Sequence, residues 1–299
     1  HEISLFFYAE NVLEVETPVL CHAIGTDPFL DFFSTAELTG KQPSLYLQTS
    51  PEFAMKRLLA AQTGSIYQIT KAFRKGELGR LHNPEFSMLE WYRVGYDLRQ
   101  LMDDAELLLG RLLPEEYFSE PATRLCYANV FQQYTGLNAL QFDLECYQLV
   151  AEKRGLFDAI RLCANDHSSW LDFLFSHIVQ QELVKYGVCM IYDYPACLPS
   201  LARLNTDNPL TVARVEVFVN GIELANGYYE LADPQQQRQR FEQEILIRER
   251  NGAERVQQDE RFLAALQNGL PDCSGIAIGL DRLLMIISHY PSLKPQQQL

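Results

Sequence analysis

The sequence predicts an α+β fold, an antiparallel sheet flanked by helices. Two pairs of strand-like segments carry most of this prediction: residues 66–73 with 85–93, and residues 213–219 with 222–230. Each pair is joined by a loop that contains Gly and Asn, and strands joined by such turns run antiparallel. Helix-like segments lie between the pairs, and a last strand-like stretch, residues 273–279, precedes a closing helix.

Composition limits the chain to one large domain, or one with a small insertion. Its 299 residues are 47% hydrophobic, with no apolar run long enough to span a bilayer, so no membrane partner is expected. The seven cysteines show no CxxC spacing, so we expect neither disulfides nor a zinc site, and the cytoplasm is the expected location. The net charge of −14 argues mildly against a tRNA partner.

The elements expected before the first hairpin are a helix over residues 1–11, an edge strand over 12–20, a strand over 45–49 and a helix from about 51 to 64. Pro18 cannot donate to a ladder, so the edge strand is expected to end near it. Ser50 precedes a proline at the start of the helix and is the expected capping residue. Glu52 lies at the helix N-terminus, where a carboxylate complements the helix dipole.

The elements expected after the first hairpin are a helix over 97–113, a loop over 114–125, a mostly helical region over 126–185, a buried strand over 188–195 and polar helices over 235–251 and 260–270. We therefore expect a catalytic domain over residues 1–290 with a helical insertion around 126–187. The Gln- and Pro-rich end, residues 291–299, is expected to be disordered. His167 and His177 are expected to be structural, since neither has a metal-ligand partner at helical spacing.

The first hairpin separates a packing face from a polar face. Side chains alternate along a strand, so Phe86, Met88, Glu90 and Tyr92 share one face, while Ser87, Leu89 and Trp91 share the other. The first set predicts a sheet face that carries a carboxylate, a phenol and a ring. Arg74 ends the preceding strand and is expected to lie beside Glu90.

The second hairpin brings two carboxylates together. A two-residue turn at residues 220–221 pairs Phe218 with Glu223 and Glu216 with Ala225, which places both glutamates on one face. Close carboxylates repel each other unless a cation or a proton lies between them. A solvated sheet face is the plain alternative, but on so apolar a hairpin we favour a hard divalent ion.

The same hairpin predicts a β-bulge. Asn226, Tyr228 and Glu230 have the parity that places them on the face opposite to Glu223. If they share its face, an extra residue must lie between Glu223 and Asn226, and Gly227 is expected to assist it.

The last strand leaves one face bare. Cys273, Gly275, Ala277 and Gly279 alternate with Ile276 and Ile278, so the small residues share a face on which something else can lie. Arg282 follows in the first turn of the closing helix.

These segments resemble the three motifs of class II aminoacyl-tRNA synthetases, lysyl branch. The residues that carry the resemblance are Phe73-Arg74, Arg80 to Phe86 and Leu89 to Tyr92 for motif 2, the first helix and strand for motif 1, and Asp272 to Leu283 for motif 3. The resemblance covers the chain except the helical insertion and the tail. It implies a homodimer formed through motif 1, and activation of an amino acid by ATP with Mg²⁺.

The resemblance also assigns roles to residues. It implies that ATP is bound by Arg74, Arg80, His82, Asn83, Phe86, Glu216, Glu223, Gly279 and Arg282, with Arg74 and Arg282 catalytic and Glu216 and Glu223 holding Mg²⁺. It implies that the amino acid is bound by Ser50, Glu52, Glu90, Tyr92, Asn226, Tyr228, Glu230 and Ala277. Two carboxylates and a phenol that converge, from Glu90, Glu230 and Tyr92, also fit the far ammonium group of lysine or a lysine isomer.

Ala277 narrows the resemblance. Lysyl-tRNA synthetases have Gly at this place, whereas the free-standing paralogues that ligate (R)-β-lysine to a lysine of translation elongation factor P have Ala. One methyl group can shift substrate preference by ~1–3 kcal/mol. Because nothing in this sequence precedes motif 1, no anticodon-binding domain is expected. Both features favour the protein ligases.

The sequence departs from the family's motif 2 at one position, and it leaves two other functions open. The motif 2 pattern has Glu two places after its Arg, where this chain has Gly76, and Glu77 follows as a candidate substitute. The first alternative is a truncated lysyl-tRNA synthetase that activates α-lysine. The second is a regulatory module that binds lysine or nucleotide without turnover.

Overall fold

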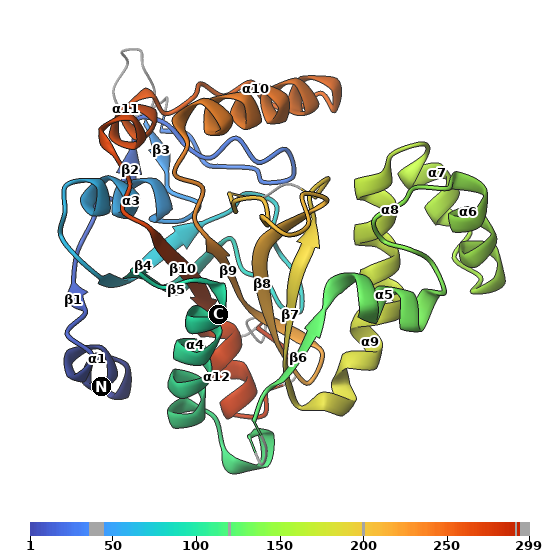
Figure 1. The fold of residues 1–299 in the computed structure, drawn as a ribbon, viewed down its shortest axis with the longest axis horizontal. Coiled ribbons are helices and arrows are strands. Elements are labelled where there is room, and N and C mark those ends of the chain that lie inside the picture. The colour runs from blue at the N-terminus through green and yellow to red at the C-terminus, as the bar shows by residue number, and fades with distance from the viewer. Residues whose placement is uncertain (36–44, 119–120, 199–200, 291, 294–299) are drawn as a thin grey trace, which may run out of the picture. The chain divides into compact units, whose positions relative to one another are not determined.

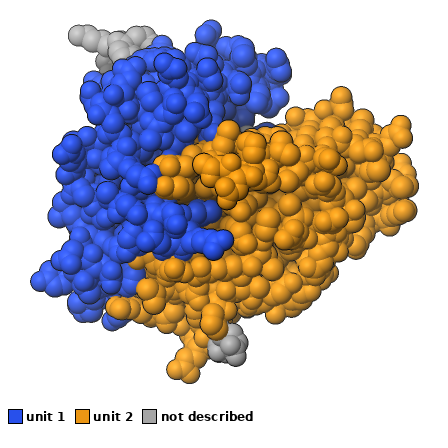
Figure 2. Space-filling model, viewed as in Figure 1, with its two compact units in different colours: residues 1–101, 230–299 blue, residues 102–229 orange. Residues whose placement is uncertain are grey.

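The computed structural model describes residues 1–35, 45–118, 121–198, 201–290 and 292–293. It contains two compact units, His1–Leu101 with Glu230–Leu299 and Met102–Tyr229, which Figure 2 distinguishes by colour. The catalytic domain over 1–290 with an insertion around 126–187 stays a prediction. Of the tail predicted to be disordered, only Ser292 and Leu293 are described.

The first unit contains four strands in the order β1-β4-β5-β10. Their bounds are Leu13–Glu14 for β1, Ile66–Phe73 for β4, Glu85–Val94 for β5 and Cys273–Gly279 for β10. The β1–β4 pair is parallel. The β4–β5 pair is antiparallel, as the hairpin predicted, and the β5–β10 pair is also antiparallel. A separate antiparallel pair joins β2 (Leu20–Cys21) to β3 (Tyr46–Leu47).

The edge strand predicted over residues 12–20 is wrong in extent. Only residues 13–14 pair with β4, and Val15 adds one more backbone hydrogen bond to Tyr67. The proline at 18 has no N–H to donate, and the hydroxyl of Thr17 donates instead to the side chain of Gln68 at 3.0 Å. The backbone hydrogen bonds between this segment and β4 therefore end before Pro18, and a side-chain hydrogen bond from Thr17 follows them.

The register of the central strands determines which side chains meet. Glu90 of β5 lies opposite Gln68 of β4 on one side and Ala277 of β10 on the other. Tyr92 lies in the same way between Ile66 and Gly275. Cross-strand partners share a face, so these two rows form one continuous surface.

The opposite face of the same strands is the packing face. Trp91 and Leu89 of β5 are fully buried. Phe7 of helix α1 (Glu2–Ala9) lies 5.5 Å from Trp91 and stacks on Tyr67 at 4.4 Å, measured between ring centroids. Helix α12 (Leu280–Ile287) also contacts β5. The separation of faces predicted from alternation is confirmed.

The other helices of this unit cluster around aromatic rings. They are α3 (Glu52–Ala60), α10 (Pro234–Arg250) and α11 (Glu260–Asn268). Helix α4 (Leu98–Leu112) follows β5, and its residues are divided between the two units. Phe53 of α3 stacks on Phe262 of α11 at 4.5 Å and lies 5.6 Å from Phe241 of α10. Asp233 and Asp259 cap α10 and α11 by accepting from backbone N–H groups. These helices support α3, whose first turn carries Glu52.

The second unit contains four strands in the order β9-β8-β7-β6. Their bounds are Ile222–Tyr229 for β9, Thr211–Val219 for β8, Val188–Pro195 for β7 and Thr123–Cys126 for β6. Strand β6 runs parallel to β7, so the loop predicted over 114–125 is wrong at its end. It also contains the short helix η1 (Glu115–Tyr117). Only the four residues of β6 pair with β7, and so short a strand gives no clear alternation signal in the sequence.

The chain between β6 and β7 is helical, and Figure 1 shows these helices grouped together. They are α5 (Tyr127–Thr135), α6 (Leu144–Lys153), α7 (Asp158–Cys163), α8 (His167–Leu174), η2 (Phe175–Val179), α9 (Gln180–Glu182) and η3 (Leu183–Tyr186). Trp170, Tyr127 and Phe131 lie at the centre of its core, together with buried residues of β7 and β8. His167 bonds to Tyr147 and His177 to the Phe173 carbonyl, contacts that fit their structural reading.

Candidate active site

Three carboxylates and a lysine meet in the first unit. Nζ of Lys56 lies 2.5 Å from Oε1 of Glu52 and 2.6 Å from Oε2 of Glu230, and the Lys56 and Glu230 side chains are each 1% exposed. On β5, the Tyr92 hydroxyl donates to Oε1 of Glu90 at 2.6 Å, and both residues are buried. The structure therefore brings together Glu52, Glu90, Tyr92 and Glu230, as the sequence predicted.

The charges of this cluster act on one another. Burial, reinforced by the negative charge of Glu52, raises the pKa of Glu90 to about 8, while the hydroxyl of Tyr92 and the ammonium of Lys56 oppose this rise. Burial also raises the pKa of Tyr92 well above its usual value. Burial lowers the pKa of Lys56, but Glu230 and Glu52 outweigh it and hold that pKa above its ordinary value. The cluster thus keeps a protonated carboxyl beside an ion-paired ammonium near neutral pH.

The small residues of β10 form the floor of this cluster. A Cβ on Gly275 would lie 2.3 Å from Cε1 of Tyr92 and 2.9 Å from Oε1 of Glu230, so only glycine fits there. Ala277 lies opposite Glu90 in the register and is partly exposed on the same face. The bare strand face predicted from sequence is therefore filled by the ring and the carboxylate.

Ser50 lies at the start of α3, although not as its N-cap. The helix begins at Glu52 with Pro51 as its N-cap residue, so the predicted capping position is one residue too early. The Ser50 hydroxyl still accepts a hydrogen bond from the Glu52 backbone N–H at 3.4 Å. This contact holds the carboxylate-bearing turn next to residue 50.

Arg74 lies at the end of the hairpin away from Glu90, and the prediction that it lies beside Glu90 is wrong. The register pairs Phe73 with Glu85 and Gln68 with Glu90, so most of the length of β4 separates them. The Arg74 guanidinium instead lies over the Phe86 ring at 5.2 Å and 3.7 Å from Oε1 of Glu77. Both residues belong to one hairpin, but its register places them at different points along the strands.

The loop between β4 and β5 is connected to α12. Nη2 of Arg282 lies 2.5 Å from Nε2 of His82, and its Nε donates to the Leu81 carbonyl at 3.2 Å. Arg282 also packs its methylenes beneath Gly279, where a Cβ would lie 3.8 Å or more away. The residues from the two motifs, loop and helix, therefore lie together as predicted.

The same loop contacts the chain after α12. The N–H of Leu293 donates to the Arg80 carbonyl at 2.7 Å, and the Asn83 side chain donates to the Leu293 carbonyl at 3.4 Å. The side chain of Arg80 is exposed. The loop thus offers exposed basic side chains while its backbone is bonded.

The second unit confirms the predicted bulge. Phe218 pairs with Glu223 as expected, but Glu216 pairs with Asn226 and not with Ala225, because the register shifts by one residue at Leu224. The bulge lies on the turn side of Ala225, so Gly227 takes no part in it. The extra residue reverses the parity that follows and places Asn226 and Tyr228 on the face of Glu216.

A hydrogen-bonded network covers that face. Arg214 forms an ion pair with Glu216, and its Nε donates to Oδ1 of Asn226 at 3.1 Å. The Asn226 amide donates to the Tyr228 hydroxyl at 2.7 Å, and the Tyr194 hydroxyl donates to Oε2 of Glu216 at 2.6 Å. The arrangement fixes the Asn226 and Tyr228 side chains in one orientation.

Glu216 and Glu223 lie close enough to interact. Burial raises the pKa of Glu216, Arg214 opposes this rise, and the charge of Glu223 adds to it. Arg214 balances one of the two carboxylates, so one negative charge remains when both are ionised. Carboxylate oxygens of this kind suit Mg²⁺, which usually takes one or two protein carboxylates together with substrate phosphate oxygens. Within the described part of the chain, no group of three or more His, Cys, Asp or Glu side chains forms a complete metal site.

Two residues of these clusters escaped the sequence analysis, Lys56 and Arg214. Each is a basic residue in an element already predicted, and each neutralises a predicted carboxylate. Lys56 follows Glu52 by four residues, the helical spacing for an ion pair, which was the available signal. Arg214 precedes Glu216 by two residues on one strand face, which was a comparable signal.

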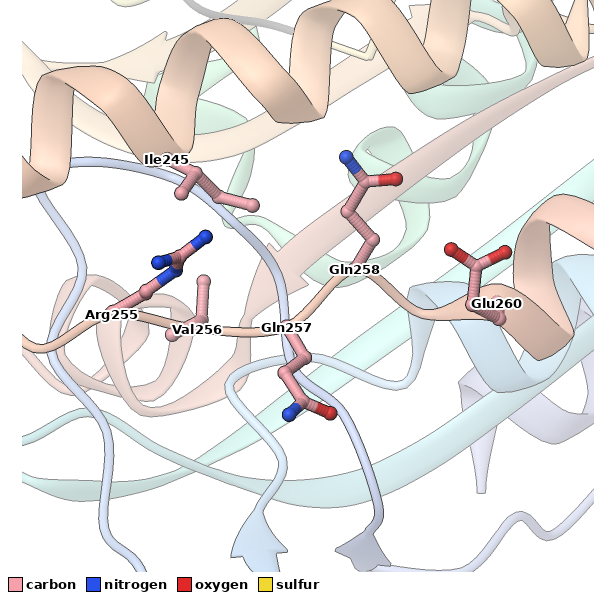
Figure 3. A pocket seen from close by; sticks show the side chains of 6 residues that line it. All are labelled: Ile245, Arg255, Val256, Gln257, Gln258 and Glu260. Atoms are coloured by element: carbon pink, nitrogen blue, oxygen red, sulfur yellow. The ribbon is translucent and has the colours of Figure 1, made fainter.

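A cavity of 610 Å³ lies beside α10, apart from the predicted site residues. Figure 3 shows its lining: Ile245 from α10, Arg255 to Gln258 from the segment that follows, and Glu260 from α11. Two apolar side chains and four polar ones line it, with no convergent catalytic pair. It therefore adds nothing to the chemistry of the carboxylate cluster.

Glu244 of α10 predicts a pH-dependent stability. Burial, with the charges of Asp27 and Glu52, raises its pKa to about 7 from an ordinary 4.5, although Thr26 donates to it. A carboxyl whose pKa is raised in the folded state binds its proton more tightly there than in the unfolded chain. Its contribution to the free energy of unfolding is complete below the unfolded pKa and is lost as the pH rises through 7. We expect the free energy of unfolding, measured with urea, to fall as the pH rises from about 5 to 7. One titrating group contributes at most about 1.4 kcal/mol per pH unit to this fall, and Glu244→Gln should remove that contribution.

The matched control is Glu242→Gln, on the exposed side of the same helix. It is expected to leave the pH dependence of the unfolding free energy unchanged. Equal slopes for the wild type and Glu244→Gln would contradict the assignment of this titration to Glu244.

No helix in the described part of the chain has both the length and the apolar character needed to span a bilayer. The family of class II tRNA synthetases (D, K and N) matches residues 1–296. The chain is 43% identical to the elongation factor P–(R)-β-lysine ligase of Vibrio atlanticus, over 97% of this chain and 89% of that protein. It is 44% identical to the ligase of the same name from Vibrio vulnificus, over 95% of this chain and 87% of that protein.

The geometry and the comparisons agree on the fold. The strands that resemble motifs 2 and 3 pair with each other, the small face of the motif 3 strand underlies the carboxylate cluster, and an arginine of the last helix reaches the motif 2 loop. The α+β class predicted from sequence is confirmed. The chain belongs to the class II tRNA synthetase family that comprises the D, K and N enzymes.

Proposed function

We propose that this chain activates (R)-β-lysine with ATP and ligates it to a lysine side chain of elongation factor P. The observation that carries the proposal is the cluster of the partly buried Glu52 with the buried Glu90 and Glu230, which suits the ammonium groups of a diamino acid. The curated relatives named above carry this function in their names. Tyr92 and Ala277 complete the pocket.

The amino acid is activated by attack of its carboxylate on the α-phosphorus of ATP, which releases diphosphate. The enzyme's task is to hold both reactants in line and to neutralise the charge that develops on the phosphoryl oxygens. Arg74 and Arg282 supply fixed positive charge, with Arg80 and His82 for the outer phosphates. Phe86 stacks against the adenine, and Asn83 and Gly279 contribute contacts to the nucleotide.

Glu216 and Glu223 are the residues that would hold Mg²⁺. When bound, the ion neutralises phosphate charge and orients the leaving diphosphate. Arg214 stays paired with Glu216 and limits the negative charge of the pair. Asn226 and Tyr228, fixed by that network, line the stem of the substrate.

The second half of the reaction needs no protein nucleophile. The amine of the acceptor lysine attacks the adenylate carbonyl, forms the amide bond and releases AMP. Three oxygen acceptors near the far ammonium, from Glu90, Glu230 and Tyr92, hold the activated acid meanwhile. Ser50 and Glu52 hold its other ammonium group.

We infer a homodimer formed through the N-terminal elements. Tyr8 and Leu5 of α1 are 82% and 45% exposed, and Leu13 of β1 is 55% exposed. Apolar side chains exposed this close in sequence are expected where a second copy covers them. Sedimentation of the purified chain tests this state.

Amino-acid-dependent ATP–pyrophosphate exchange, run with α-lysine and (R)-β-lysine side by side, tests the proposal. We expect exchange with both and a higher kcat/KM for (R)-β-lysine. Labelling of purified elongation factor P should then exceed charging of tRNA-lysine. Preferred charging of tRNA would overturn the proposal in favour of a lysyl-tRNA synthetase, and absence of exchange would favour a module that binds without turnover.

A further inference from the structure

Lys56 is a buried ammonium within the cluster of Glu52, Glu90 and Glu230. It lies one turn after Glu52 on α3, and its Nζ is within 2.6 Å of carboxylate oxygens from Glu52 and Glu230. Its remaining neighbour on that side is the Phe262 ring, 5.9 Å from Nζ to the centroid. A lysine is rarely this buried unless its charge is paired, and removal of either partner leaves the other charge buried and uncompensated.

The charge balance of the pocket indicates what Lys56 does. Glu52, Glu90 and Glu230 supply three negative charges when ionised, and Tyr92 is neutral because its pKa is raised. A diamino acid brings two ammonium groups, while its carboxylate reacts with ATP. Glu90 and Glu230 are buried and the Glu52 side chain is 17% exposed. Three carboxylates and two ammonium groups would leave one negative charge without compensation, which is costly in a largely buried site.

We propose that Lys56 is a specificity-determining residue: a resident ammonium that neutralises one of the three carboxylates, so that the pocket takes a substrate with two ammonium groups. This inference rests on the proposed function. The charged groups that act on Lys56 or on which it acts are Glu52 on its own helix, Glu90 on β5 and Glu230 after β9. Glu244 of α10 acts on the same cluster through Glu52.

Binding of a substrate ammonium group beside Glu90 should release a proton. Without substrate, Glu90 carries a proton near neutral pH, and an arriving ammonium group ionises it, so binding releases a proton. The charge of Lys56 lowers the pKa of Glu90 and makes this release easier. Below about pH 8, kcat/KM for lysine should therefore rise with pH and then level off.

The experiment is a double-mutant cycle of Lys56→Met and Glu230→Gln. Each single change removes one charge and should raise KM for lysine about 10- to 100-fold, with a smaller effect on kcat. The double variant removes one charge of each sign and should have a KM closer to the wild type than either single variant. In Lys56→Met the pH at which kcat/KM levels off should move upward.

Calorimetry of lysine binding gives a readout that does not depend on turnover. In buffers of different ionisation enthalpy, the wild type should release about one proton per lysine at pH 7 and fewer above pH 8. This measurement applies even if Lys56→Met does not fold.

Three outcomes would overturn the inference. They are multiplicative KM effects in the double variant, a Lys56→Met variant that loses thermal stability but keeps its KM and pH profile, and lysine binding to the wild type without proton release. A wild type that binds lysine with proton release but shows no exchange would refute the proposed function and leave the inference standing.

Discussion

Replacing Arg74 by alanine is expected to lower the rate of lysine-dependent ATP–pyrophosphate exchange by about 10²- to 10³-fold. The guanidinium lies over the Phe86 ring and near Glu77, at the end of the hairpin distant from the amino-acid cluster. Under the proposed mechanism it neutralises charge that develops only in the transition state, so kcat should fall more than KM for lysine rises. Steady-state exchange kinetics with varied lysine and varied ATP separate the two effects.

Lys71→Ala is the matched control for that variant. Lys71 lies on β4, three residues before Arg74. Its side chain is half exposed, and its partner Glu85 lies 3.7 Å away and is also exposed. An exposed pair of this kind contributes little to stability, and exchange should remain near the wild-type rate. If the two variants lost activity equally, a general disturbance of the hairpin would explain the result, and the role of Arg74 would be refuted.

The sequence predicted the hairpins well because their signals are local. Alternation and turn residues placed β4 and β7 at their observed bounds and β5 within one residue. The bulge in β9 was predictable because Glu223 and Asn226 could share a face only if an extra residue lay between them. Its position at Leu224 was not predictable from turn chemistry, since no glycine marks it and both Leu224 and Ala225 are buried.

The sequence predicted the carboxylates of the candidate site and the basic residues of motifs 2 and 3, but it did not predict Lys56 and Arg214. Carboxylates were sought as ligands for an ammonium or a metal, whereas Lys56 and Arg214 act on those carboxylates and not directly on a ligand. The distance between Arg74 and Glu90 depends on register, which a sequence fixes only when the turn is short. The loop of motif 2 is long, so pairing partners along β4 and β5 had to come from the structure.

Replacing Gly275 by alanine is expected to raise KM for lysine about 10- to 100-fold and to lower the free energy of unfolding by ~1–3 kcal/mol. The new Cβ would lie 2.3 Å from Cε1 and 2.4 Å from Cδ1 of Tyr92, distances that require the ring to move. The ring is buried and its hydroxyl donates to Glu90 at 2.6 Å, so movement breaks the hydrogen bond that positions the carboxyl. Exchange kinetics and urea unfolding measure the two effects.

Gly110→Ala separates this steric effect from the general effect of adding a methyl group. Gly110 lies in α4 with no atom within 4 Å of an added Cβ, so alanine should leave KM unchanged and stabilise the helix by up to about 1 kcal/mol. A Gly275→Ala variant with normal KM and reduced stability would show that Tyr92 can shift without losing Glu90. In that case the phenol would not orient the carboxyl, and the ammonium would have to be held by Glu90 and Glu230 alone.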